Sequence, residues 1–289
     1  MTWVARNHDR IDRIRAYVLD FQAVKPGLFA YFQGNDQRVI NDQRVIGAQT
    51  VFPLTPDSDR GVALLLYFCA LYQDIGEGKL VRVLAYLWRQ YEADIFRLNR
   101  LPFDPLQEKL QTLTDLRDWT LWSKSPGILR SVCDFFYRHG RIVPWVYAQE
   151  DGEACVHILA EEVFLMGKTS PFKTKARYFL WLLTQLPGVE PERFWSARTR
   201  APLSKGHIRF LRELGPLKDR KSVPWVGAEE KLDYFNRFYQ LLFPGKPWMA
   251  FAALDAFLKP SPGDTWACRR IIGTCSRCAL ADICPGKVG

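Results

Sequence analysis

Apolar residues recur along most of the chain at the spacing of three and four residues that is typical of amphipathic helices. In the segment 8–21 this spacing joins Ile11, Ile14, Tyr17, Val18 and Phe21. The same pattern predicts further helices over 60–73, 79–96, 127–140, 153–166, 175–186, 206–215, 229–243 and 248–258. Segments rich in proline and basic residues separate them and are predicted loops, among them 100–105, 123–126 and 216–224. The pattern therefore predicts an all-α fold.

One stretch, 38–52, departs from the helical pattern and is the single candidate strand. It overlaps a direct repeat, NDQRVI at 35–40 and again at 41–46. The repeat can form a short hairpin with Asn41 and Asp42 in the turn. It can equally be a duplication tolerated in a surface loop, which is the interpretation we favour. We assign the repeat no function.

Composition is that of an ordinary folded protein, with 48% hydrophobic and 25% charged residues among 289. The longest apolar run, 61–72, is too short to span a bilayer and suits a buried helix. The segment MTWVARNHDR contains no apolar stretch of the kind found in signal peptides. We therefore expect a cytoplasmic protein without a membrane partner.

The charge of the chain is concentrated in one segment. Lys and Arg number 40 against 31 Asp and Glu, a net charge of +9. Between Lys168 and Lys221 thirteen basic and four acidic residues give 13 − 4 = +9, so the rest of the chain sums to zero. Such a segment is typical of proteins that bind a polyanion, most often nucleic acid. The alternative is a solvated basic face with no partner.

Four of the seven cysteines lie within CRRIIGTCSRCALADIC at 268–284. Cys268, Cys275, Cys278 and Cys284 have the spacing C-x6-C-x2-C-x5-C, and four thiolates can hold a [4Fe–4S] cluster or a tetrahedral zinc ion. Structural zinc sites usually contain two close pairs of cysteines, whereas this segment has one, so the spacing favours the cluster. The remaining three, Cys69, Cys133 and Cys155, are predicted to be small core residues.

The cysteine spacing in a helical protein resembles the iron–sulfur branch of the helix-hairpin-helix DNA glycosylases, to which endonuclease III and MutY belong. The Ala-Asp-Ile before Cys284 and the pair Arg269-Arg270 also fit that family's cluster loop. The resemblance implies that Arg269, Arg270 and Arg277 contact the phosphates of double-stranded DNA. It also implies a role in DNA repair through base excision, and we expect a monomer associated with the nucleoid.

The family's hairpin binds a phosphate through backbone N–H groups at a helix N-terminus. In LPGVEPERF (186–194) an acid and a proline follow the glycine, so we discount this stretch. The favoured hairpin is 164–185, between a helix that ends near Met166 and one that begins near Lys173. There Gly167 supplies the turn, and Thr169 or Ser170 caps the next helix. The predicted DNA-binding residues of this hairpin are Gly167, Lys168, Thr169 and Lys175.

From Ser170 to Leu258 the chain resembles an uncharacterised bacterial group of helix-hairpin-helix iron–sulfur proteins. In that comparison Lys173 takes the place of the hairpin lysine, which implies either Schiff-base chemistry or a phosphate contact. Ser204 stands where the family has its catalytic aspartate, and a hydroxyl cannot supply the missing negative charge. An alternative role for Ser204 is the N-cap of the helix over 206–215. Gln73 is a weaker candidate for a residue that inserts into the base stack.

These expectations combine into a two-lobed fold. A helical barrel over 60–187 ends in the hairpin, and a cluster lobe joins 1–59 to 190–289 and carries the loop 268–284. Two functions stay open. The first is a DNA N-glycosylase or abasic-site lyase that acts on a flipped nucleotide. The second is an inactive DNA- or lesion-binding protein that keeps the scaffold but lacks the aspartate.

Overall fold

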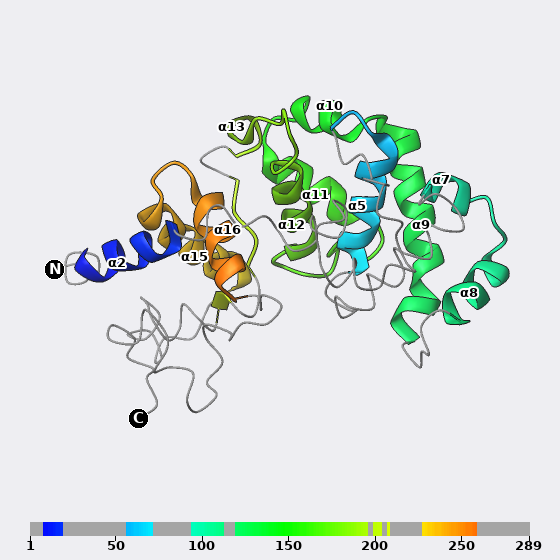
Figure 1. Cartoon of the computed structure of the whole chain (residues 1–289), viewed down its shortest axis with the longest axis horizontal. Helices are drawn as coiled ribbons and strands as arrows, with labels where there is room; N and C mark the ends of the chain where they lie inside the picture. The colour runs from blue at the N-terminus through cyan, green and yellow to red at the C-terminus, as the bar shows by residue number, and fades with distance from the viewer. Residues whose placement is uncertain are drawn as a thin grey trace, which may run out of the picture. The chain divides into compact units, whose positions relative to one another are not determined.

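The computed structural model describes residues 8–19, 56–71, 94–112, 119–195, 199–203, 207–208 and 227–258 (Figure 1). All the regular secondary structure in these residues is helical, so the predicted all-α class holds for them. The helices are α2 (His8–Leu19), α5 (Asp59–Leu71), α7 (Ile95–Leu98), α8 (Phe103–Thr112), α9 (Trp119–His139), α10 (Ile142–Tyr147), α11 (Gly152–Glu162), α12 (Thr174–Leu183), α13 (Pro191–Phe194), α15 (Ala228–Leu242) and α16 (Pro247–Leu258). The candidate strand 38–52, with the NDQRVI repeat, lies outside the described residues, as does most of the predicted helix 206–215.

The chain divides into two compact units. The central unit comprises Gly27–Thr199 and contains α5 and α7 to α13. The terminal unit comprises Met1–Pro26 and Arg200–Gly289 and contains α2, α15 and α16. Within the described residues, none of the helices combines the length and the apolar character needed to cross a membrane.

Helix α5 forms the core of the central unit. Every residue from Gly61 to Leu71 is buried, as expected for the nearly continuous apolar run GVALLLYFCAL. Figure 1 shows α5 between α9 and α12, with which it makes its main contacts. Helix α12 is buried along its length as well, because both of its sides face other helices of this unit. The predicted buried helix is therefore the element around which the others pack.

Helix α9 corrects two predictions at once. It begins at Trp119, not near residue 127, and it runs through the predicted loop 123–126 with Pro126 in its interior. Proline lacks the N–H that a helix interior uses, and so the local sequence argues against a helix here. Ser125 and Pro126 are buried, however, and the Ser125 hydroxyl is 2.5 Å from the Tyr67 hydroxyl on α5. Packing against α5 therefore outweighs the local preference of this turn.

A further correction concerns the end of the predicted helix over 79–96, of which residues 79–93 lie outside the described residues. Asp94 has an extended backbone (φ −78°, ψ 99°), and a new helix, α7, begins after it. The Asp94 carboxylate accepts hydrogen bonds from the N–H groups of Phe96 at 3.0 Å and Arg97 at 3.2 Å. An aspartate that caps the following turn in this way cannot also continue a preceding helix. The periodic pattern had concealed this boundary.

The terminal unit joins the beginning of the chain to its last described helices. Helix α2 packs against α15 and α16. The Arg15 guanidinium donates from Nε to the carbonyl of Leu242 at 2.6 Å and from Nη2 to that of Leu241 at 2.7 Å. The last carbonyls of a helix have no partner within it, so this cation satisfies the C-terminus of α15.

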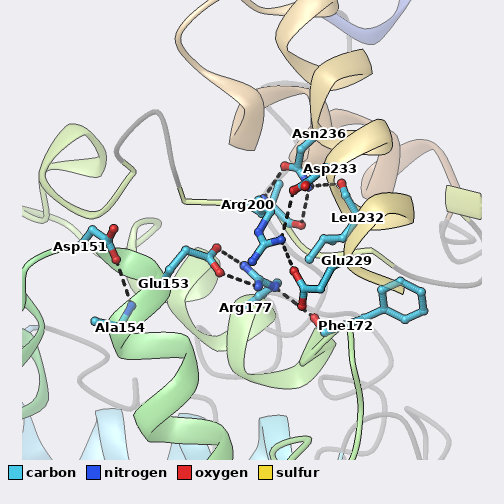
Figure 2. A network of polar contacts seen from close by, with 11 residues as sticks. Asp151, Glu153, Ala154, Phe172, Arg177, Arg200, Glu229, Leu232, Asp233 and Asn236 are labelled. Atoms are coloured by element: carbon cyan, nitrogen blue, oxygen red, sulfur yellow. Dashed lines mark hydrogen bonds and ion pairs between the residues drawn. The ribbon is translucent and has the colours of Figure 1, made fainter. Parts of the chain in front are cut away.

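The residues that enter this unit at Arg200 are also tied to α15. Arg200 pairs with Glu229 and Asp233, and Asn236 accepts a hydrogen bond from the Ala201 N–H at 2.6 Å (Figure 2). Asn236 is buried, so its amide satisfies backbone groups that water cannot reach. The chain segment 200–201 is thereby fixed along one side of α15.

We expect the substitution Tyr67→Phe to lower the free energy of unfolding by about 1–2 kcal/mol, because it leaves the buried Ser125 hydroxyl without its partner. Burial raises the pKa of Tyr67 to about 12, so the hydroxyl stays protonated across the neutral range. Urea unfolding of the full chain, followed by circular dichroism, measures the effect. The double variant Tyr67→Phe/Ser125→Ala should be more stable than Tyr67→Phe, and a lower stability would contradict this account.

Candidate functional site

The candidate site is the loop 163–173 between α11 and α12. Helix α11 begins with Asp151 as its N-cap, whose carboxylate accepts from the Ala154 N–H at 3.0 Å. The helix ends at Glu162, four residues before the predicted end near Met166, because Val163 is already extended (φ −98°, ψ 121°). The loop is therefore longer than the hairpin that the sequence predicted.

Successive turns carry the chain from α11 to α12. The N–H groups of Met166, Ser170 and Lys173 donate to the carbonyls three residues earlier, at 3.1, 2.9 and 3.1 Å. Gly167, between the first and the second of these turns, has a positive φ of 110°, which glycine adopts without strain. A Cβ atom at this position would lie 3.2 Å from the Cα of Lys173, so a larger residue is also sterically unfavourable. The backbone of Gly167 thus lies against that of Lys173.

The cap of α12 corrects the prediction made for Thr169 and Ser170. Neither side chain caps the helix, and the N-cap residue is Lys173, in a left-handed conformation with φ 43° and ψ 41°. The turn from Ser170 to Lys173 delays the start of α12 to Thr174, which lies four residues after Ser170. Left-handed backbone is costly for a residue with a Cβ atom, so other contacts must hold Lys173 in place.

Arg177 on α12 provides these contacts (Figure 2). Its Nε donates to the carbonyl of Phe172 at 3.0 Å, next to Lys173. Both terminal nitrogens of the guanidinium bind the two oxygens of Glu153 on α11, with Nη2 at 2.7 Å from Oε2. Only 1% of Arg177 is exposed, so this pair is screened very little by solvent. One buried ion pair therefore fixes the end of the loop to the first turn of α11.

The three lysines of this segment have three different environments. Lys173 is half-buried, and within the described residues its ammonium group has no ion-pair or hydrogen-bond partner. Lys168 is exposed and pairs with Glu161 at 2.9 Å. Lys175 is only 8% exposed, and its ammonium donates to the carbonyl of Ala70 at 2.5 Å. A ligand could therefore bind the Lys173 ammonium without breaking a contact in the described residues, whereas the Lys168 ammonium is already paired with Glu161.

Lys175 was predicted to bind DNA, and its placement does not support that role. Ala70 belongs to the last turn of α5, whose carbonyls have no partner within the helix. The buried ammonium satisfies one of these groups and lies where the helix dipole favours a cation. Its function in this structure is to join α12 to the C-terminus of α5.

A pocket of about 570 Å³ lies between the end of α11, the loop and the start of α12. It is lined by Ala160, Glu161, Glu162, Val163, Phe164, Leu165, Gly167, Lys168, Thr169, Ser170, Thr174 and Lys175. The half-exposed ring of Phe164 lies against Gly127 of α9, where an added Cβ atom would be 3.4 Å from the ring, in ordinary van der Waals contact. Glu162 is held by Arg138 and His139 of α9, each 2.8 Å from its Oε2 atom. The pocket therefore combines apolar walls, hydroxyl groups and charges that are mostly paired.

The discounted stretch 186–194 forms a tight turn between α12 and α13. The Val189 N–H donates to the Leu186 carbonyl at 3.2 Å, and Gly188 has a φ of 80°. The exposed acid Glu190 is the N-cap residue of α13, which has only four residues. Its carboxylate adds negative charge beside this turn, which is unfavourable for a phosphate.

The other predicted site residues lie outside the described residues. These are Gln73, Ser204, the four cysteines Cys268, Cys275, Cys278 and Cys284, and Arg269, Arg270 and Arg277. Among the residues that are described, no cluster of His, Cys, Asp or Glu has the composition of a metal site. Burial raises the pKa values of Cys133 and Cys155 to about 12, so these thiols are protonated at neutral pH and are poor metal ligands.

Sequence reasoning missed the acidic residues of this site. Glu153, Glu161 and Glu162 all lie on α11, and each binds a basic side chain from another segment. The doublet Glu161-Glu162 at the end of the predicted helix was the available signal. The doublet does not indicate which basic side chain binds each acid. The partner of Glu162, for example, is Arg138, which is 24 residues away in the sequence.

We expect Arg177→Ala to destabilise the protein by about 3–5 kcal/mol, because it leaves the Glu153 carboxylate partly buried without its cation. Arg60→Ala is the matched control, since Arg60 is 62% exposed and pairs with Asp94 at 3.3 Å. That change should cost about 1 kcal/mol or less. Urea unfolding of the two variants gives both free energies of unfolding. An equal decrease in the two variants would show that the buried pair contributes no more to stability than the exposed one.

Comparison with known proteins does not identify a relative. No protein-family model matches the chain, and no curated protein or solved structure matches it either. The functional interpretation therefore depends on the residues of this chain and on their arrangement.

Proposed function

We propose that this chain is a DNA-binding iron–sulfur protein of the helix-hairpin-helix DNA glycosylase superfamily. Its reaction is that of an N-glycosylase or abasic-site lyase that acts on a flipped nucleotide during base excision repair. On the structural side one observation carries the proposal, the position of Lys173. Its backbone is held in an unusual conformation at the start of α12, and its ammonium has no partner within the described residues.

The chemistry available to such a lysine is imine formation. An unprotonated amine adds to the aldehyde carbon of an opened abasic sugar, and loss of one water molecule leaves a Schiff base. This step needs no carboxylate, so it remains possible with Ser204 at the position of the family's aspartate. Cleavage of an intact glycosidic bond is more demanding, because positive charge develops on the sugar and a nearby carboxylate stabilises it. The lyase reaction is therefore the better match to this set of residues.

The loop 163–173 also offers groups for the DNA backbone. Lys168 is 69% exposed, and Thr169 is exposed beside it. Both follow Gly167, in the part of the loop that lines the pocket. Lysine and hydroxyl groups are common contacts of phosphate oxygens and position the protein without reading the base sequence. We assign to these two residues a role in binding and to Lys173 the chemistry.

The chemistry of the donor set supports the [4Fe–4S] cluster. Cys268, Cys275, Cys278 and Cys284 supply four thiolates within seventeen residues, and the uneven spacing is the reason to prefer the cluster to zinc. When bound, the cluster would cross-link this segment. Arg269, Arg270 and Arg277 are within two residues of a ligating cysteine in the sequence, so the cluster would also restrict their positions. These arginines are the proposed additional phosphate contacts.

A second candidate is a DNA-binding protein without catalytic activity. The observation in its favour is Ser204, since a hydroxyl carries no charge and Lys205 beside it carries the wrong one. In that case Lys173 is a phosphate contact, and the protein binds DNA or a lesion without turnover. The two candidates share the scaffold and differ only in the role of Lys173.

Anaerobic purification tests the cofactor. We expect a brown protein with iron and acid-labile sulfide in the proportions of one [4Fe–4S] cluster, and we expect Cys278→Ala to lose both. Cys133→Ala is the control and should keep its full iron content, because Cys133 lies on α9, outside the segment 268–284, and its thiol is protonated at neutral pH. A colourless protein that contains stoichiometric zinc would contradict the cluster assignment.

Borohydride trapping on duplex DNA with an abasic site tests the reaction. We expect a covalent protein–DNA adduct that is absent in Lys173→Ala and present in Lys168→Ala. Because Lys168 is a proposed phosphate contact, its loss should instead reduce the slope of log K against log salt by about 0.9. Tight binding of the wild-type protein without any adduct would favour the non-catalytic candidate. The absence of DNA binding would remove both.

A further inference from the structure

The two acidic residues that end α11 have unequal partners. Glu162 is bound by the Arg138 guanidinium and by the His139 ring, so its carboxylate is committed to α9. Glu161 is bound by Lys168 alone among the described residues, at 2.9 Å, and Lys168 likewise has no other partner there. Both residues line the pocket. The Glu161–Lys168 pair is therefore the ionic contact through which the loop is attached to the end of α11.

This pair is of the kind that an incoming anion can open. The side chains of Lys168 and Glu161 are 69% and 50% exposed, and a single nitrogen–oxygen contact joins them. Pairs that are exposed to this extent shift an equilibrium by about fivefold at most, because water and salt screen them and ordering the two side chains costs entropy. The ammonium has three N–H donors, but a phosphate group that reaches Lys168 would lie next to the Glu161 carboxylate. Repulsion between the two anions then favours release of the carboxylate when the phosphate binds.

We propose that Glu161 is an intramolecular competitor of the DNA phosphate for Lys168, and that it thereby sets the DNA affinity of the loop. This inference rests on the proposed function, namely on DNA binding by the loop 163–173. In the free protein the carboxylate holds the Lys168 ammonium at the pocket. When DNA binds, the ammonium transfers to a phosphate, and the Glu161 carboxylate is left in water.

Removal of the competitor should strengthen binding. We expect Glu161→Gln to lower the Kd for a duplex by about 1.5- to fivefold at low salt, which is the range that exposed ion pairs contribute. The gain should decrease as the salt concentration rises, because screening weakens the pair and the phosphate contact alike. Lys168→Ala should raise the Kd, since it removes the group for which the two anions compete.

A matched control separates this effect from that of net charge. Glu150→Gln changes the charge by the same amount at an exposed position before the N-terminus of α11. From Gly152 to Glu161 the helix rises by roughly 14 Å, which exceeds the Debye length of about 8–10 Å near physiological salt. At physiological salt Glu150→Gln should therefore tighten binding less than Glu161→Gln does, and the two variants are compared under that condition.

The experiment is fluorescence anisotropy with a labelled DNA duplex and the full-length chain, at low and at physiological salt. The proteins are the wild type, Glu161→Gln, Glu150→Gln, Lys168→Ala, Lys173→Ala and the double variant Glu161→Gln/Lys168→Ala. We expect Glu161→Gln to lower the Kd in the wild-type background by more than Glu150→Gln does. In the Lys168→Ala background, Glu161→Gln should lower the Kd by no more than Glu150→Gln does in the wild type. Circular dichroism verifies that each variant is folded.

The outcomes distinguish a failure of the competitor role of Glu161 from a failure of DNA binding itself. If Lys168→Ala weakens binding but Glu161→Gln does not exceed the Glu150→Gln control, the competitor is wrong and the proposed DNA-binding loop stands. An equal gain from Glu161→Gln in the wild-type and in the Lys168→Ala backgrounds would show simple charge repulsion, and this too overturns the inference. If the wild type binds no duplex, the proposed function fails and the competitor fails with it. If the wild type binds but neither lysine affects binding, the loop 163–173 is not the DNA-binding element, so the competitor fails while DNA binding through other residues stands.

Discussion

The buried ion pair between Arg177 and Glu153 is the constraint on which the candidate site depends. It joins α12 to the first turn of α11, and the same guanidinium holds the carbonyl of Phe172 at 3.0 Å. The two helices therefore approach each other at a defined position, and the loop between them has a fixed end. Lys173, whose backbone is left-handed, lies between this anchored carbonyl and the start of a buried helix. A buried pair of this kind is costly to form and more costly to break, since either partner alone would be a charge with little access to water.

The lysines of this loop show how one residue type acquires different roles within a few positions. Lys175 is buried and satisfies the end of α5, Lys168 is exposed and shared with Glu161, and Lys173 has no described partner. A count of basic residues between 168 and 221 treats them alike. Their environments give Lys175 a role in stability, Lys168 an exchangeable contact and Lys173 the proposed chemistry. The basic segment is thus a mixture of structural and available charges.

The proposals for function share one electrostatic theme. Where a carboxylate is expected, at Ser204, the chain has a hydroxyl next to a lysine, which disfavours the glycosylase step and leaves imine chemistry open. Where only cations are expected, in the hairpin, the chain has Glu161 against Lys168. A loop that carries its own competing anion binds a polyanion less tightly, and with less dependence on salt, than its lysines alone would indicate, because salt also weakens the competing pair. Selectivity for a particular DNA structure is easier to achieve from such moderate affinity, because non-specific binding is purely electrostatic.

The sequence by itself determined the helical class, since the spacing of apolar residues predicted α2, α5, α11, α12, α15 and α16 close to their observed positions. It also supplied the cysteine spacing and the turn at Gly167, because both are local patterns. Only the tertiary structure decided the helix through Pro126, which is stabilised by burial against α5, and the new start of a helix at Asp94. It alone distinguished the lysines, because the partner of Lys175 is Ala70, 105 residues away, and the position of Lys173 depends on Arg177. Periodicity reports which face of a helix is buried, whereas the partner of a polar group depends on segments that the chain brings together only when it folds.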